Sequence, residues 1–258
     1  MKISPYGDQP HTEWSETTQK LIADHPLTTE EMREAVTSSW KALWSTEVGE
    51  GIAKIPLKEL APPATVIGYF FEKILAKELS EKHKNQWKGG VGSEKDLHYV
   101  DDPKYSIEVK SSGQLGMKIY GNRSYGQEIE NKDRAKKDKS GYYLTVNFHE
   151  DKLNLVRFGW IDGKDWVPQK SQTGQMAGLS SEVYDGKLIP IQGEYTLGAP
   201  LLILNGVGKN VADQCSELGI NSVNDALQNK DKLNGKLKKV YDNAIAYRDK
   251  YAVRKDGN

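Results

Sequence analysis

The sequence predicts an α/β fold in which a mixed β-sheet core is flanked by helices and followed by a small helical module. Three observations lead to this prediction: an amphipathic segment at residues 65–82, several alternating segments between residues 96 and 161, and a helical region with a glycine-rich turn beyond residue 201. We therefore expect an N-terminal helical segment (residues 1–60), a core (61–198) and a C-terminal module (199–258).

Helical signals dominate the first third of the chain. The run Thr28–Glu31 is typical of a helix start, and aromatic and aliphatic residues follow it at helical spacing. After the break at Pro62 and Pro63, residues 65–82 predict an amphipathic helix. We expect its apolar side to consist of Ile67, Phe70, Phe71, Ile74, Leu75 and Leu79.

Strand signals follow in pairs. Residues 96–100 and 105–110 alternate on either side of a turn at 101–104, which predicts a hairpin. Residues 142–148 and 153–161 predict two further strands, and the charged stretch 128–139 before them predicts a helix. Residues 165–178 predict a long polar loop with one aromatic anchor, Trp166.

Composition is that of a folded protein, with 37% hydrophobic and 28% charged residues. The one cysteine, Cys215, cannot form an internal disulfide, and no stretch approaches the ~20 apolar residues that span a bilayer. We expect a cytoplasmic protein without a membrane segment. The 36 basic and 36 acidic residues balance overall, but residues 201–258 carry ten basic and seven acidic groups, against six and ten in residues 1–60.

The predicted hairpin contains the candidate catalytic residues. Glu108 and Lys110 are two residues apart and share one face of their strand, while Asp96 lies on the partner strand. Two carboxylates make an oxygen-rich site suited to Mg²⁺, and the adjacent lysine can orient water for in-line hydrolysis of a phosphodiester. Glu72, on the preceding helix, is a further candidate. The alternative is a solvated hairpin with a surface ion pair, and Glu72 as an exposed helix glutamate.

This arrangement resembles the PD-(D/E)xK nuclease superfamily. Segments of residues 86–148, including Gln-Trp-Lys-Gly-Gly, Ile-Glu-Val-Lys-Ser-Ser and Gly-Asn-Arg-Ser-Tyr-Gly-Gln, resemble the ScaI-like type II restriction endonucleases. The resemblance implies that Asp96 and Glu108 bind the metal, that Lys110 is the catalytic lysine, and that a palindromic site in double-stranded DNA is cut to blunt ends. Lys95 stands where the superfamily pattern has proline.

A glycine-rich turn near the carboxyl end is typical of a helix-hairpin-helix module. In residues 202–212 the glycines permit a tight turn, and a helix beginning after Gly208 would offer amide donors to a DNA phosphate. The predicted phosphate contacts are Gly206, Val207, Gly208 and Lys209. The alternative is an ordinary glycine turn with Val207 in the core.

Two polar segments could contact base edges, since paired hydrogen bonds from arginine, asparagine and glutamine distinguish bases. The candidates are Asn122, Arg123, Ser124 and Gln127 in the first segment, and Gln169, Gln172 and Gln175 in the second. The alternative is that these side chains only satisfy turns.

Three functions remain open. A type II restriction endonuclease would act as a homodimer, because one centre cuts one strand and a twofold dimer suits a palindrome. A structure-specific repair nuclease can join a related core to a helix-hairpin-helix tail, but such enzymes typically resemble Glu-Arg-Lys where this chain has Glu108-Val109-Lys110. A non-catalytic DNA-binding protein would require the three site residues to coincide by chance.

Overall fold

The computed structural model describes residues 4–122, 139–168 and 176–252. Contacts divide the chain into two units, the first formed by Met1–Ser112, Lys118–Val146 and Arg157–Ile189, and the second by Gly113–Met117, Asn147–Val156 and Pro190–Asn258. The helix predicted at 128–139 lies outside the described residues, apart from Lys139. Within the described part, no helix is long and apolar enough to cross a membrane.

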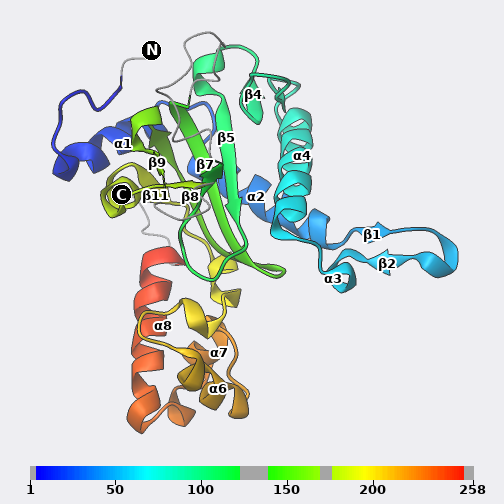
Figure 1. The fold of residues 1–258 in the computed structure, drawn as a ribbon, viewed down its shortest axis with the longest axis vertical. Helices are drawn as coiled ribbons and strands as arrows, with labels where there is room; N and C mark the ends of the chain where they lie inside the picture. Colours follow the sequence, from blue (N-terminus) through cyan, green and yellow to red (C-terminus); the bar gives the residue numbers. More distant parts are fainter. Residues whose placement is uncertain (1–3, 123–138, 169–175, 253–258) are drawn as a thin grey trace. The chain divides into compact units, whose positions relative to one another are not determined.

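A six-stranded sheet, ordered β11-β8-β7-β5-β4-β3, forms the centre of the α/β fold (Figure 1). The predicted hairpin is confirmed, because β4 and β5 pair antiparallel with Leu97 opposite Ile107. The strands predicted at 142–148 and 153–161 are confirmed as β7 and β8. The bounds are β3 (Trp87–Gly89), β4 (Leu97–Tyr99), β5 (Ile107–Ser112), β7 (Gly141–His149), β8 (Lys152–Ile161) and β11 (Leu188–Pro190).

Helices α2 and α4 confirm the two helical predictions of the first third. Thr28 and Glu31 form a capping box at the start of α2, and α4 follows the predicted range within one residue. The first unit also contains short helices near its amino end and before β11. The bounds are η1 (His11–Glu13), α1 (Trp14–Ala23), α2 (Thr29–Trp44), α3 (Leu57–Leu60), α4 (Ala64–Lys82), η3 (Pro103–Tyr105), η5 (Gly163–Asp165) and α5 (Ser181–Gly186).

One side of α4 packs closely on the sheet. A side chain at Gly68 would place its Cβ 2.2 Å from the Ser111 hydroxyl, so glycine lets the helix approach β5. The helix buries Ile67, Phe71, Leu75, Ala76 and Leu79. The prediction for Phe70 was wrong, since it is 39% exposed. Its position lies at the margin of a stripe that repeats every four residues, beyond the reach of α2 and the sheet.

A small sheet, ordered β6-β10-β9, carries the segments with the candidate base contacts. Its strands are β6 (Gly121–Asn122), β9 (Val167–Pro168) and β10 (Met176–Gly178). Ala177 of β10 and the expected anchor Trp166 join a buried cluster with Tyr143 and Ile161. The prediction of a loop over all of 165–178 was therefore wrong at its ends, where backbone pairing with distant residues forms strands.

A separate hairpin between α2 and α3 was not predicted. Its strands β1 (Glu47–Val48) and β2 (Ile55–Pro56) pair only with each other, and every residue from 45 to 55 is exposed. The segment has two glycines and no alternation long enough to indicate strands.

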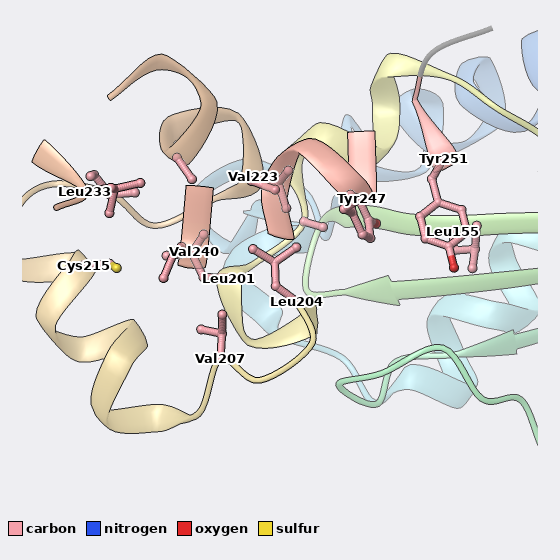
Figure 2. Packing of buried hydrophobic residues seen from close by; sticks show 14 residues of the cluster. Leu155, Leu201, Leu204, Val207, Cys215, Val223, Leu233, Val240, Tyr247 and Tyr251 are labelled. Carbon is pink, nitrogen blue, oxygen red and sulfur yellow. The ribbon is translucent and has the colours of Figure 1, made fainter. Parts of the chain in front are cut away.

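The second unit has its own core (Figure 2), to which Leu204, Val207, Cys215 and Val240 contribute. The predicted helical character beyond residue 201 is confirmed. Gly219 (φ 77°) follows α6, and Ser222 caps the start of α7. The bounds are η6 (Glu194–Gly198), η7 (Leu201–Ile203), α6 (Lys209–Glu217), α7 (Val223–Gln228), η8 (Lys230–Lys232), η9 (Gly235–Leu237) and α8 (Lys238–Tyr251).

A buried histidine fixes the approach to β5. The ring of His25 lies 4.6 Å from that of Tyr142 and 4.9 Å from that of Phe158. Its Nδ1 accepts from the Leu27 amide at 3.1 Å, so Nε2 carries the proton and donates to the Tyr105 carbonyl at 3.0 Å. Burial lowers the pKa of His25 to about 4, so its imidazole is neutral near pH 7. This ring links the segment between α1 and α2 to Tyr105, two residues before β5 begins.

We expect His25 to make the protein less stable as the pH falls below neutrality. The folded pKa, about 4, lies below the value of 6.5 for a free histidine, so the unfolded chain binds the extra proton between these limits. Stability present above pH 6.5 is therefore lost on acidification, by about 2 kcal/mol at pH 5. Urea unfolding of the wild type and His25→Gln at pH 7 and pH 5 measures this loss. Equal losses in both proteins would contradict the assignment.

Candidate active site

Asp96, Glu108 and Lys110 lie together at the β4–β5 hairpin. Because Leu97 is opposite Ile107, Asp96 falls beside Glu108 on the neighbouring strand. The Asp96 carboxylate accepts a hydrogen bond from the Val109 amide at 2.8 Å. The Lys110 ammonium donates to Glu108 Oε1 at 2.8 Å and lies 3.9 Å from Asp96 Oδ2. The structure thus brings the three predicted residues into one cluster.

Strand alternation explains why these side chains share a face. Ile107 and Val109 are buried in the core, so Glu108 and Lys110 point to the opposite side of β5. Glu108 is nevertheless only 4% exposed, which is rare for a carboxylate. Lys110 also donates to the Val109 carbonyl at 3.0 Å, which holds its ammonium close to both acids.

Electrostatics at the cluster favour a cation. Burial raises the pKa of Asp96, and the neighbouring charge of Glu108 raises it further, whereas Lys110 acts in the opposite direction. The lysine therefore compensates only part of the repulsion between the two acids. A bound cation would stabilise both carboxylates in their ionised form.

The donor set fits Mg²⁺. No group of three or more histidine, cysteine, aspartate or glutamate side chains suited to a metal occurs among the described residues. Mg²⁺ does not require one, because it is usually held by one or two carboxylates together with water and substrate phosphate oxygens. Asp96 and Glu108 supply that number from two neighbouring strands, on one face of the sheet.

Glu72 approaches the cluster from α4. Its negative charge is one of the causes that raise the pKa of Asp96. Its carboxylate also forms an ion pair with Lys73 at 2.8 Å. Glu72 therefore acts on Asp96 through its charge, but its ion-pair partner is Lys73 and not a residue of the Asp96–Glu108–Lys110 cluster.

Lys95 immediately precedes Asp96 in the sequence. It is 9% exposed, and its ammonium lies 5.0 Å from the centre of the Tyr143 ring. An added Cβ at Gly141 would lie 2.7 Å from Lys95 Cε, so this glycine leaves room for the lysine. The lysine before Asp96 is thus accommodated by packing against Gly141 and Tyr143.

A pocket of about 220 Å³, whose lining includes His98 and Ser106, was not predicted from the sequence. His98 lies two residues after Asp96, and Ser106 lies two residues before Glu108. His98 and Ser106 therefore lie on the same face of the sheet as the two carboxylates. His98 is 3.5 Å from the Ser106 hydroxyl and 3.6 Å from Glu94. The same alternation that identified Glu108 and Lys110 could have identified this neighbouring pair.

The C-terminal glycine turn has an open backbone. Gly206 has φ 69°, which favours glycine, and an added Cβ at Gly206 or Gly208 would meet nothing within 4 Å. Gly208 precedes α6, whose first amides point out of the helix without intrahelical acceptors. Val207 is buried and its amide donates to the Leu204 carbonyl, so its side chain serves the core. Lys209 is exposed and pairs with Asp213 at 3.0 Å.

Most candidate base contacts lie outside the described residues, namely Arg123, Ser124, Gln127, Gln169, Gln172 and Gln175. Asn122 is described, and its backbone pairs with Met176 across β6 and β10. These two residues border the two undescribed stretches, 123–138 and 169–175. The small sheet therefore brings the ends of both candidate segments side by side.

Comparison with known proteins adds two findings. A family model described as ScaI restriction endonuclease matches residues 4–192, which include the whole cluster. The chain is also 36% identical over 197 residues to the type II restriction enzyme ScaI of Streptomyces caespitosus, covering 73% of this chain and 84% of that relative.

Neutralising Asp96 should stabilise the metal-free protein. The folded pKa of Asp96 is raised, so its ionised form costs stability at neutral and alkaline pH. Asp96→Asn removes the charge and keeps an oxygen for the Val109 amide. We expect a higher unfolding midpoint in a chelator at pH 8, by about 2–4 °C for each kcal/mol gained. Asp8→Asn, at an exposed position, should leave the midpoint unchanged, and a lower midpoint for Asp96→Asn would contradict the electrostatic account.

Proposed function

The chain belongs to the ScaI restriction endonuclease family and is a type II restriction endonuclease, and we propose that it cuts duplex DNA with a PD-(D/E)xK centre at Asp96, Glu108 and Lys110. The observation that carries this proposal is the close grouping of buried Glu108 and half-buried Asp96 beside Lys110. Family membership favours the restriction enzyme over the repair nuclease and the non-catalytic DNA-binding protein.

We propose Mg²⁺ as the cofactor, held by Asp96 and Glu108. When bound, the ion supplies Lewis-acid stabilisation of negative charge on the phosphate. Lys110 lies on the same face as Glu108 and carries its ammonium 2.8 Å from that carboxylate, where it can orient a water molecule and stabilise developing charge. Glu72 is proposed to act more remotely, by adding negative charge near Asp96.

The enzyme is proposed to act as a homodimer on a short palindrome. One centre of this kind hydrolyses one strand, so two copies related by a twofold axis are needed to cut both strands symmetrically. Blunt ends would follow if the two centres face phosphates directly opposite each other. Because DNA is the substrate, we place the activity in the cytoplasm.

Residues 199–258, in the second unit, are proposed to be a helix-hairpin-helix module that binds phosphates. Residues 193–258 lie beyond the family match, so the proposal depends on the turn itself. An open backbone at Gly206 and Gly208, the outward amides of α6 and the exposed Lys209 offer donors that any duplex could use. The side chain of Val207 is buried and its amide donates to the Leu204 carbonyl, so a phosphate contact at Val207 would have to share that amide.

Base contacts are proposed for the two segments that the small sheet joins. The candidates are Asn122, Arg123, Ser124 and Gln127 in one segment and Gln169, Gln172 and Gln175 in the other. The proposal is supported by the pairing of Asn122 with Met176, two described residues that each border one of the segments.

The catalytic proposal is tested by digestion of a sequenced plasmid with Mg²⁺ and end-mapping of the fragments. The wild type should give discrete fragments, and chelation should stop cutting. Asp96→Ala, Glu108→Ala and Lys110→Ala should each lose at least about 10²-fold in rate. Lys104→Ala, an exposed lysine on the same hairpin, is the matched control and should cut normally. Cutting only at branched DNA would indicate a repair nuclease, and full activity in any of the three variants would remove that residue from the centre.

The phosphate-binding proposal is tested by DNA affinity at several salt concentrations. Lys209→Ala should weaken binding to all duplexes and make the slope of log affinity against log salt shallower by about one unit. The cleaved sequence should stay the same, because such contacts carry no base information. Lys250→Ala, in the last turn of α8, is the control and should keep the slope.

Two glycine variants separate DNA contact from folding. Gly208 has an ordinary φ of −88° and open space around it, so Gly208→Ala should fold normally yet hinder close approach of a phosphate. Gly206→Ala should destabilise the unit as well, because of its positive φ. Unchanged affinity in both Gly208→Ala and Lys209→Ala would make the turn a packing element.

A further inference from the structure

Apolar side chains gather on the outside of the first unit, around the β1–β2 hairpin and the start of α4. We call residues 45–70 the arm surface. Its large apolar side chains include Ile52, which is fully exposed, and Tyr69, which is 57% exposed. The complete set is Val48, Ile52, Ile55, Leu60, Val66, Tyr69 and Phe70. Half of the exposed large apolar side chains of the described residues therefore fall within about a tenth of the chain.

The hairpin of the arm surface has no core of its own. Each strand is two residues long, and every residue from 45 to 55 is exposed. Figure 1 shows the hairpin extending away from the six-stranded sheet beyond α3. An isolated two-stranded hairpin is at best marginally stable in water, so contact with another surface would stabilise it. A concentration of exposed apolar groups is typical of a protein interface.

The charges of the arm surface disfavour DNA as its partner. Residues 45–55 contain Glu47, Glu50 and Lys54, a net charge of −1, and Lys54 pairs with Glu47. Residues 60–71 contain no charged side chain. DNA-binding surfaces are positively charged, because they neutralise phosphates. Residues 56–59 add one lysine and one glutamate, so the whole arm surface has a net charge of only −1. A surface with so little net charge is compatible with its own copy, since two identical patches can meet across a twofold axis with little like-charge repulsion.

The position of the arm surface suits a dimer of two nuclease centres. Tyr69 lies one helical turn before Glu72, whose charge acts on Asp96. The ammonium of Lys73, paired with Glu72, lies 5.4 Å from the centre of the Tyr69 ring. An interface at this end of α4 would hold the two centres near each other, which cutting both strands of one duplex requires.

We propose that the arm surface binds the arm surface of a second copy of this chain across a twofold axis. The inference rests on the proposed function for the need of two centres, and adds the surface that joins them. Stable interfaces of this kind bury about 800 Å² on each partner, with aromatic residues near their centre. Tyr69 and Phe70 supply the aromatic part, and the hairpin extends the area.

The first experiment measures oligomeric state by sedimentation at micromolar concentration. The wild type should be a dimer, whereas Ile52→Glu and Tyr69→Glu should raise the dimer dissociation constant at least tenfold, because each places two like charges in an apolar interface. Val100→Glu is the matched control, since Val100 is 49% exposed elsewhere on the first unit, and should stay dimeric. Unchanged thermal midpoints establish that the variants are folded.

The second experiment uses cross-linking through single cysteines. In a Cys215→Ser background, Ile52→Cys should give covalent dimers with a short bifunctional maleimide, and Val100→Cys should not. A monomeric wild type, a dimer insensitive to both glutamate variants, or cross-linking at Val100 alone would overturn the interface. So would a monomer whose DNA affinity falls in Ile52→Glu, which would make the hairpin a DNA contact.

Plasmid digestion by the wild type distinguishes this inference from the proposed function. Site-limited fragments from a dimer that ignores the arm variants would overturn the interface and leave the nuclease assignment intact. A dimer that depends on the arm surface but gives no cleavage at any metal concentration would support the interface and overturn the catalytic proposal.

Discussion

The antiparallel register of β4 and β5 is the constraint on which the site depends. With Leu97 opposite Ile107, Asp96 lies beside Glu108, and the Val109 amide can bind the Asp96 carboxylate at 2.8 Å. A shift of β5 by one residue would turn Glu108 and Lys110 toward the core and Val109 toward the metal position. The register is held from the face opposite the charged cluster, because Leu97 and Ile107 are buried and α4 packs on β5 where Gly68 meets Ser111.

That constraint has an energetic cost that the surroundings offset. Glu108 is buried and Asp96 is half-buried beside it, and both burial and the charge of Glu108 raise the pKa of Asp96, so the ionised pair destabilises the fold when no cation is bound. Lys110 compensates part of the repulsion. The aromatic packing around His25, which ties the Tyr105 carbonyl in place, stabilises the start of β5 independently of the charges. Packing of apolar residues can thus keep mutually repelling carboxylates in place for a cation and a phosphate to bind.

The two units divide the proposed work. The family match at residues 4–192 includes the carboxylate cluster, whereas the glycine turn at 204–208 belongs to a unit with its own core. Because Val207 is used for packing, the open backbone on either side of it is what remains for a ligand. The cleavage rate and the non-specific affinity for DNA can therefore change independently of each other. The proposed contact through the arm surface would bring together the nuclease centres of two copies of the chain.

Local patterns in the sequence by themselves determined α4, β7 and β8, the cap of α2 at Thr28, and the shared face of Glu108 and Lys110, because helical and strand periodicities act over a few residues. Only the tertiary structure decided which distant segments meet. It placed Glu72 near Asp96, paired Asn122 with Met176, put His98 beside Ser106 and left Phe70 exposed. These relations depend on strand register and on which faces other elements cover, and periodicity within one segment contains no information about either.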